Sequence, residues 1–241
     1  MMRVWRWIVD RFAILIEATH SPEIAFARDL RGPSILLPLV VLGLSFATIA
    51  ALQWPLGIQW TQHQLQAAGA TPEQVASALD LARKSQQWAT FAVPLLLLLK
   101  WLLFALILWV PSQIFLENPV FSRVLSVVAY SYVPILVRDA TVLFILRMQG
   151  IAAVTQSEQM TAAVGLNLLL PHLRVPWSVM AGNFNIFELW YVILLPVGIS
   201  RIAAARWQRA LAITLSGWVF VLLMQCGAAV LGLSLRNSIG R

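Results

Sequence analysis

Two long apolar stretches decide the fold: ATFAVPLLLLLKWLLFALILWV (89–110) and VLSVVAYSYVPILVRDATVLFIL (124–146), separated by PSQIFLENPVFSR (111–123). Each stretch reaches the roughly 20 residues that an α-helix needs to cross the hydrocarbon core of a bilayer. The link between them is short and contains Pro119, which disfavours a continuous helix. We therefore predict two antiparallel membrane-spanning helices joined by a tight turn, with the rest of the chain packed around them.

The composition of the whole chain indicates a membrane protein. Of the 241 residues, 60% are hydrophobic and only 11% are charged, with a mean hydropathy of +0.79, whereas about a quarter of a soluble domain is charged. The net charge is +7. Because most basic residues flank apolar stretches, where cations meet anionic lipid headgroups, we expect the lipid bilayer as partner and no nucleic acid.

The same length criterion predicts five spans, which together form a transmembrane domain over residues 34–235. The polar segment 55–88 should lie outside the bilayer, with a short helix from the capping box at Thr71 resting on the outer surface. A further helix is expected near 157–170, and residues 236–241 should form an outer tail. The predicted fold class is all-α, a polytopic five-transmembrane-helix bundle with an N-terminal amphipathic helix, and its spans cover about 34–54, 89–110, 124–146, 184–202 and 210–235.

Residues 1–33 are predicted to form a cytoplasmic amphipathic segment. Apolar side chains recur at helical spacing over 3–18, which is typical of a helix lying in a membrane interface. A helix docked on the protein's own bundle is the alternative. If the helix lies in the interface, its anchors should be Arg3, Trp5, Arg6, Trp7 and Arg11.

The distribution of basic residues predicts the orientation. With the N-terminus in the cytoplasm, the inner segments hold nine Lys and Arg residues and the outer segments six. Because cytoplasmic loops of membrane proteins carry the excess of Lys and Arg, we expect a cytoplasmic N-terminus and an outer C-terminus.

Charged residues inside the predicted spans are the candidate functional residues. Each charge at mid-bilayer costs about 2.5 to 3.5 kcal/mol on insertion scales, so partners are expected. Lys100 and Asp139 lie about 14 Å and 12 Å below the same outer face, and we predict that they pair. Arg138 should then pair with Glu188. Pro134, five residues before Asp139, is the candidate helix kink.

These charges have three possible roles. They can fix helix register, form a path for a polar substrate or proton, or form an interface with another subunit. No metal-binding helix, Cys/His cluster, phosphate loop or nucleophile elbow is present in the sequence. We therefore predict no catalytic residues, no metal, no cofactor and no enzymatic activity.

Two motifs resemble the Yip1-domain family of five-span membrane proteins. FSRVLSVVAYSYVP (121–134) is similar to that family's entry into the third span. NFNIFELW (183–190), followed by LLPVG (194–198), is similar to its entry into the fourth span. The resemblance covers about residues 20–235 and is closest to bacterial members, so it implies the bacterial inner membrane.

For bacterial members, the resemblance implies a non-enzymatic scaffold or accessory protein. It would contact other membrane proteins, in some cases beside an ABC-type export system, or form a homo-oligomer. The alternative that the charged residues favour is a small-solute or proton-coupled transporter or channel using Lys100 and Asp139. A continuous polar cavity reaching Asp139 would favour transport.

Overall fold

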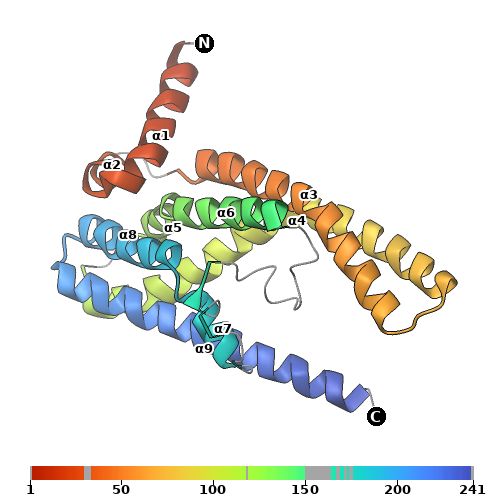
Figure 1. Ribbon diagram of the computed structural model, residues 1–241. Coiled ribbons are helices and arrows are strands. Elements are labelled where there is room, and N and C mark those ends of the chain that lie inside the picture. The colour runs from red at the N-terminus through yellow and green to blue at the C-terminus, as the bar shows by residue number, and fades with distance from the viewer. Residues whose placement is uncertain are drawn as a thin grey trace.

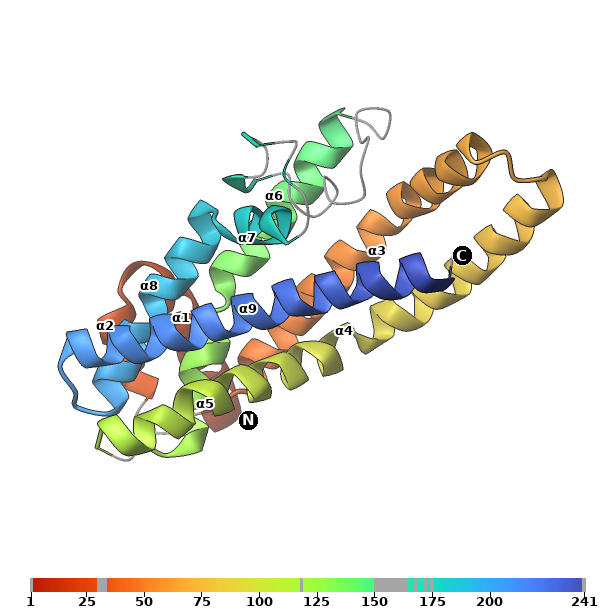
Figure 2. The same cartoon turned by 90° about the horizontal axis from the view of Figure 1, so that it is seen from below.

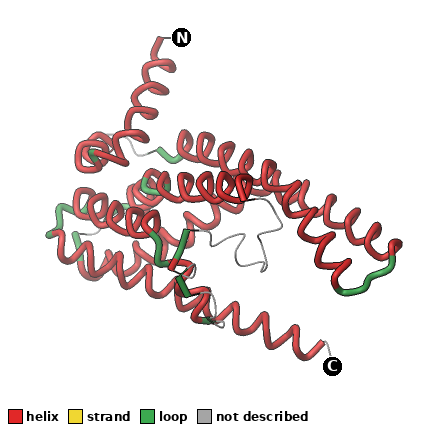
Figure 3. The backbone as a smooth tube through the Cα atoms, viewed as in Figure 1, coloured by secondary structure: helices red, strands yellow, loops and turns green. Residues whose placement is uncertain are grey.

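The computed structural model describes residues 2–29, 34–117, 119–149, 164–166, 169–170, 173 and 176–239. The described chain is helical and contains no strand, and short loops and turns join its helices where the joining residues are described (Figure 3). The helix predicted near 157–170 falls largely outside the described residues. The helices are α1 (Met2–His20), α2 (Pro22–Asp29), α3 (Leu36–Ala67), α4 (Pro72–Phe115), α5 (Phe121–Tyr130), α6 (Val133–Gln149), α7 (Trp177–Asn183), α8 (Ile186–Ile202) and α9 (Trp207–Ile239).

The chain is an all-α polytopic membrane protein, as the sequence predicts. Four described segments are long and apolar enough to cross a bilayer: α3, α4, α5 with α6, and α9. The short helices α7 and α8 provide a fifth crossing only if they count as one span bent by 65°. Figure 1 shows α3, α4, α6, α8 and α9 gathered into one elongated bundle, with α2 and the α8–α9 turn at one end.

The prediction of a short helix on the outer surface is wrong. The helix that begins beside Thr71 does not stop at the membrane but runs without a break through the predicted second span to Phe115. Thr71 and Gln74 form the expected capping box, and no Gly or Pro follows before Pro94, which lies inside the helix. At 1.5 Å per residue, the 32 residues of α3 and 44 of α4 span about 48 Å and 66 Å, well beyond a hydrocarbon core of roughly 30 Å.

The outer parts of α3 and α4 form a projecting hairpin, which we name the α3–α4 arm (residues 55–88). It extends past the remaining helices in both views (Figures 1 and 2). Val75, Leu79 and Ala82 form a weak apolar face on this part of α4, and all three are half-buried. That face packs along α3 because a neighbouring antiparallel helix covers it more completely than a lipid surface would.

Small residues let α3 and α4 approach closely at two levels. A Cβ atom at Gly43 would lie 3.1 Å from the ring of Pro94, and one at Gly57 would lie 2.9 Å from Nε2 of Gln86. Close backbone approach at small residues is how membrane helices gain packing contacts. The two helices are therefore held together both within the span and along the arm.

The N-terminal helices close one end of the bundle. α1 runs crosswise to the long helices in Figure 1, and α2 inserts the fully buried Phe26 beside α8. Arg11, which was predicted to anchor in headgroups, is instead buried, because it shares the docked face of α1 with Ile14, Leu15 and Ala18. The second half of α1 therefore packs on the protein.

The first half of α1 keeps its apolar side chains uncovered. Trp5 is highly exposed, Trp7 is moderately exposed, and Arg6 is exposed as well. The side chain of Arg3 lies outside the described part of the chain. The interfacial anchor role consequently stays a prediction for Trp5, Trp7 and Arg6.

Candidate intramembrane pocket

The third span is interrupted in the middle of the bundle. α5 ends at Tyr130 and α6 begins at Val133, so Ser131 and Tyr132 lie in a turn. Pro134 stands two residues after Tyr132, and it has no N–H group to donate to the carbonyl of Tyr130. Helical hydrogen bonding resumes when Ile135 donates to the Tyr132 carbonyl over 3.1 Å. The interruption leaves the side chain of Tyr132 at the junction of several helices.

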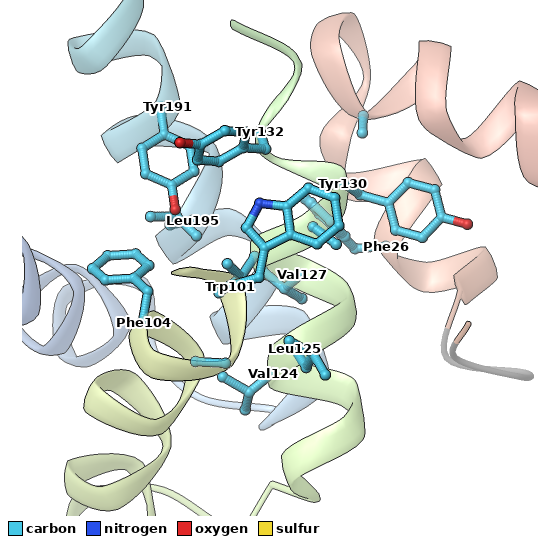
Figure 4. Close-up of a cluster of buried hydrophobic side chains, with 14 of the residues drawn as sticks. Phe26, Trp101, Phe104, Val124, Leu125, Val127, Tyr130, Tyr132, Tyr191 and Leu195 are labelled. Atoms are coloured by element: carbon cyan, nitrogen blue, oxygen red, sulfur yellow. The ribbon is translucent and has the colours of Figure 1, made fainter. Parts of the chain in front are cut away.

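Tyr132 is the centre of an aromatic cluster. Its ring centroid lies 5.7 Å from that of Phe46 on α3, 5.8 Å from Trp101 on α4 and 5.5 Å from Tyr191 on α8. Figure 4 shows Tyr132 and Tyr191 side by side with the indole of Trp101 beneath them. Aromatic pairs at such distances and tilted angles add about 0.5–1.5 kcal/mol each beyond their buried area. The cluster thereby fixes the position of the turn.

Arg138 joins two carboxylates just beyond this cluster. Its Nη1 donates to Oε1 of Glu188 over 2.6 Å, which is the pairing expected from the sequence, and its Nε donates to Oδ1 of Asp139 over 2.8 Å. The side chains of Arg138, Asp139 and Glu188 are 23%, 30% and 12% exposed. Charge-assisted hydrogen bonds in such a water-poor place are stronger than neutral ones.

The predicted ion pair between Lys100 and Asp139 does not form among the described residues. Asp139 instead accepts a hydrogen bond from Arg138, its neighbour in the chain. The prediction treated adjacent side chains on a helix as pointing about 100° apart, but the long Arg138 side chain folds back across that angle. The ammonium of Lys100 lies 5.2 Å from the centroid of the Tyr132 ring, a cation–π contact.

Lys100 and Asp139 nevertheless line the same open pocket of about 300 Å³, which we name the intramembrane pocket. Lys100 presents a positive charge from α4, and Asp139 presents a carboxylate from α6. The remaining wall is mainly apolar, with Gln53, Tyr132 and Arg138 as further polar groups. The lining residues are Phe46, Ile49, Ala50, Gln53, Val93, Leu96, Leu97, Lys100, Tyr132, Arg138 and Asp139.

Sequence reasoning found the charged residues of the pocket but missed its aromatic floor. Tyr132 stands two residues before Pro134, at the point where a proline most disturbs a helix, and this spacing is the signal that could have identified it. Phe46 and Trp101 carry no comparable signal, because aromatic residues are common throughout the spans.

The chain matches no protein-family model, no curated protein and no solved structure.

Proposed function

We propose that this protein is a non-enzymatic scaffold or accessory protein of the bacterial inner membrane, of the Yip1-domain type, which contacts other membrane proteins. Its N-terminus lies in the cytoplasm and its C-terminus outside. The observation that carries this proposal is the α3–α4 arm, a helical hairpin on two helices that are much longer than a membrane crossing requires. A paired helical extension of this kind offers a long lateral surface to a partner.

The outer face of the arm carries apolar side chains that nothing in the described chain covers. Leu81 and Trp88 on the arm are 68% and 77% exposed, and Phe91, three residues beyond the arm, is 81% exposed. Their spacing of seven and three residues places them on one side of α4. Trp88 and Phe91 suit a membrane interface, but Leu81 lies about 10 Å farther along the helix axis than Trp88. We infer that this side of the arm lies against the outer domain of a partner protein.

The rest of the arm is suited to water. Lys84 and Asp80 form an ion pair of 2.7 Å on the exposed surface of α4. The hydrogen bond from Lys84 to Asp80 and their attraction raise the pKa of Lys84 above its ordinary value. An exposed ion pair of this kind favours an aqueous setting for this part of α4.

Purification in mild detergent tests the proposal. The intact protein should co-elute with a stoichiometric membrane protein, with an ABC-type exporter as the expected class, or with a second copy of itself. A variant whose residues 60–83 are replaced by a short Gly-Asn turn should keep the bundle and lose that component. Recovery of a monodisperse monomer without partner from native membranes would refute the scaffold role.

Site-specific photo-crosslinking locates the contact. A photoreactive residue at Leu81 should crosslink to the co-eluting component, whereas one at the neighbouring Ala82, which is half-buried toward α3, should not. Equal crosslinking from both positions would show that the arm makes no defined contact.

A second function, transport of a small polar solute or of protons, is favoured by the intramembrane pocket, which reaches Asp139. Flux measured in proteoliposomes distinguishes the two functions. A transporter should lose flux in Lys100→Met while remaining folded, whereas a scaffold should show no flux above that of empty liposomes.

A further inference from the structure

The intramembrane pocket presents the ammonium of Lys100 on its α4 wall, and the carboxylate of Asp139 with the guanidinium of Arg138 on its α6 wall. We propose that it binds a zwitterion that carries a primary ammonium and an anionic oxygen, and that the phosphoethanolamine headgroup of a phospholipid is the chemical class of ligand. The anionic oxygen would lie at Lys100 and the ammonium at Asp139. This proposal does not depend on the scaffold role, because it concerns α3, α4 and α6 within the span.

Lys100 supplies the anion-binding group. An ammonium has three N–H donors, and the contact with the face of Tyr132 occupies one side of it. In the part of the chain that the structure describes, no carboxylate lies within ion-pair distance of Lys100. Donors therefore remain for a ligand oxygen in the pocket.

Asp139 supplies the complementary group. Its Oδ1 accepts the hydrogen bond from Arg138, and its side chain remains 30% exposed at the pocket wall. A carboxylate has about four acceptor positions, so one bond from Arg138 leaves capacity for the ammonium of a ligand.

Charge balance favours a zwitterion over a simple anion. In formal charge, Arg138 with its two carboxylates sums to −1, and Lys100 in the same pocket brings the sum to zero. A bound anion would leave one uncompensated charge in a water-poor region, which is costly. A zwitterion adds no net charge, and each of its ends meets an opposite charge.

The apolar wall fits the remainder of a lipid. Ile49, Ala50, Val93 and Leu96 line the pocket beside its charges. A volume of about 300 Å³ is at the lower limit of ligand pockets and holds a headgroup but not two acyl chains. The chains would remain in the bilayer along the α3–α4 surface.

Native mass spectrometry of the full-length protein, with lipids added in competition, tests the proposal. The wild type should retain phosphatidylethanolamine about tenfold more strongly than phosphatidylglycerol, which has no ammonium. Phosphatidylcholine should also bind more weakly, because its quaternary ammonium has no N–H group to donate to Asp139. Equal retention of all three lipids by the wild type would overturn the proposal without requiring any variant.

Variants then assign the two charges. Asp139→Asn should abolish the preference for phosphatidylethanolamine over phosphatidylglycerol. Lys100→Met should weaken the binding of both lipids. Lys84→Met, on the exposed arm, is the matched control and should change neither. Asp139→Glu and Lys100→Arg preserve charge and should keep the preference. A lost preference in Lys84→Met, or an unchanged one in folded Asp139→Asn, would contradict the assignment.

Free glycerophosphoethanolamine distinguishes the source of the ligand. If the headgroup alone displaces the lipid at comparable concentration, the site takes a soluble zwitterion. If only the complete lipid binds, the apolar wall contributes and the ligand comes from the bilayer. Failure of both to bind would refute the site while leaving the scaffold proposal intact.

Discussion

Replacing Gly198 by alanine tests the tightest helix contact in the described bundle. Gly198 on α8 faces Val127 on α5, and a methyl group there would lie 2.4 Å from Cγ1 and 3.0 Å from Cγ2 of Val127. The ring of Phe26 on α2 stands 3.2 Å away on another side. Val127 and Phe26 are both fully buried, so neither can move aside without displacing its own neighbours.

The expected loss follows from forced overpacking. Inserting a methylene-sized group into a filled core costs about 1–3 kcal/mol. For a chain of this length, a loss of about 2 kcal/mol lowers the unfolding midpoint by roughly 4–8 °C. Thermal unfolding of the purified protein in detergent, followed by circular dichroism or tryptophan fluorescence, measures this shift.

Two further variants separate overpacking from a general effect of alanine. Gly227→Ala on α9 has no atom within 4 Å of the new methyl group, so it should stabilise the helix by about 0.5–1 kcal/mol. Val127→Ala removes the colliding methyl groups, and combined with Gly198→Ala it should cost less than the sum of the single changes. If Gly198→Ala unfolds at or above the wild-type temperature, the α5–α8 contact described above is wrong.

Three other perturbations address the charges, the interfacial helix and the break. Arg138→Met should lower stability by about 3–5 kcal/mol in the same unfolding assay, because it strands a mostly buried carboxylate, and adding Glu188→Gln should recover part of that loss. A spin label can be attached to the Trp5→Cys variant in a Cys226→Ser background. The label should be more accessible to oxygen than to a water-soluble nickel reagent, because we predict that the start of α1 lies in the membrane interface. The reverse ranking would place the start of α1 in water. Pro134→Ala should let α5 and α6 join into one helix, seen as slower amide exchange across the turn, and unchanged exchange would show that proline does not cause the break.

The all-α membrane architecture and the location of four apolar spans could be predicted from the sequence, because bilayer thickness sets the apolar length of a span. The full lengths of α3 and α4, and the bend between α7 and α8, could not be predicted in this way. The α3–α4 arm could not be read in the same way. Polar composition over 55–88 indicates that the segment leaves the bilayer, but it does not distinguish a helix lying on the surface from one that projects. That distinction depends on the pairing of α3 with α4 at Gly57 and Gln86, which is a tertiary contact.

The charged residues of the site were predictable for the same energetic reason. An ionised group in hydrocarbon is so costly that Lys100, Asp139, Arg138 and Glu188 had to lie near one another or near water. The pairing of Arg138 with Glu188 was predicted correctly, but the partner of Asp139 was not, because the reach of the Arg138 side chain decides it. The Arg138–Glu188 pair joins α6 to α8, and the expected partner of Asp139 was displaced by a residue one position away.

The arm and the intramembrane pocket are built on the same two helices. α4 runs as one helix from Trp88 on the arm to Lys100 in the pocket, and α3 runs as one helix from Phe46 in the pocket to Gly57 on the arm. Pro94 in α4 and Pro55 in α3 lie between the arm and the pocket and are the points at which each helix bends most easily. On the other side of the pocket, the broken α5–α6 segment can adjust at Ser131 and Tyr132. A partner that tilts the arm would therefore change the separation between Lys100 and Asp139. By thermodynamic linkage, a ligand bound between these two charges would in turn change the affinity of the arm for that partner. This shared construction is the physical reason to study partner binding and pocket occupancy in the same preparation.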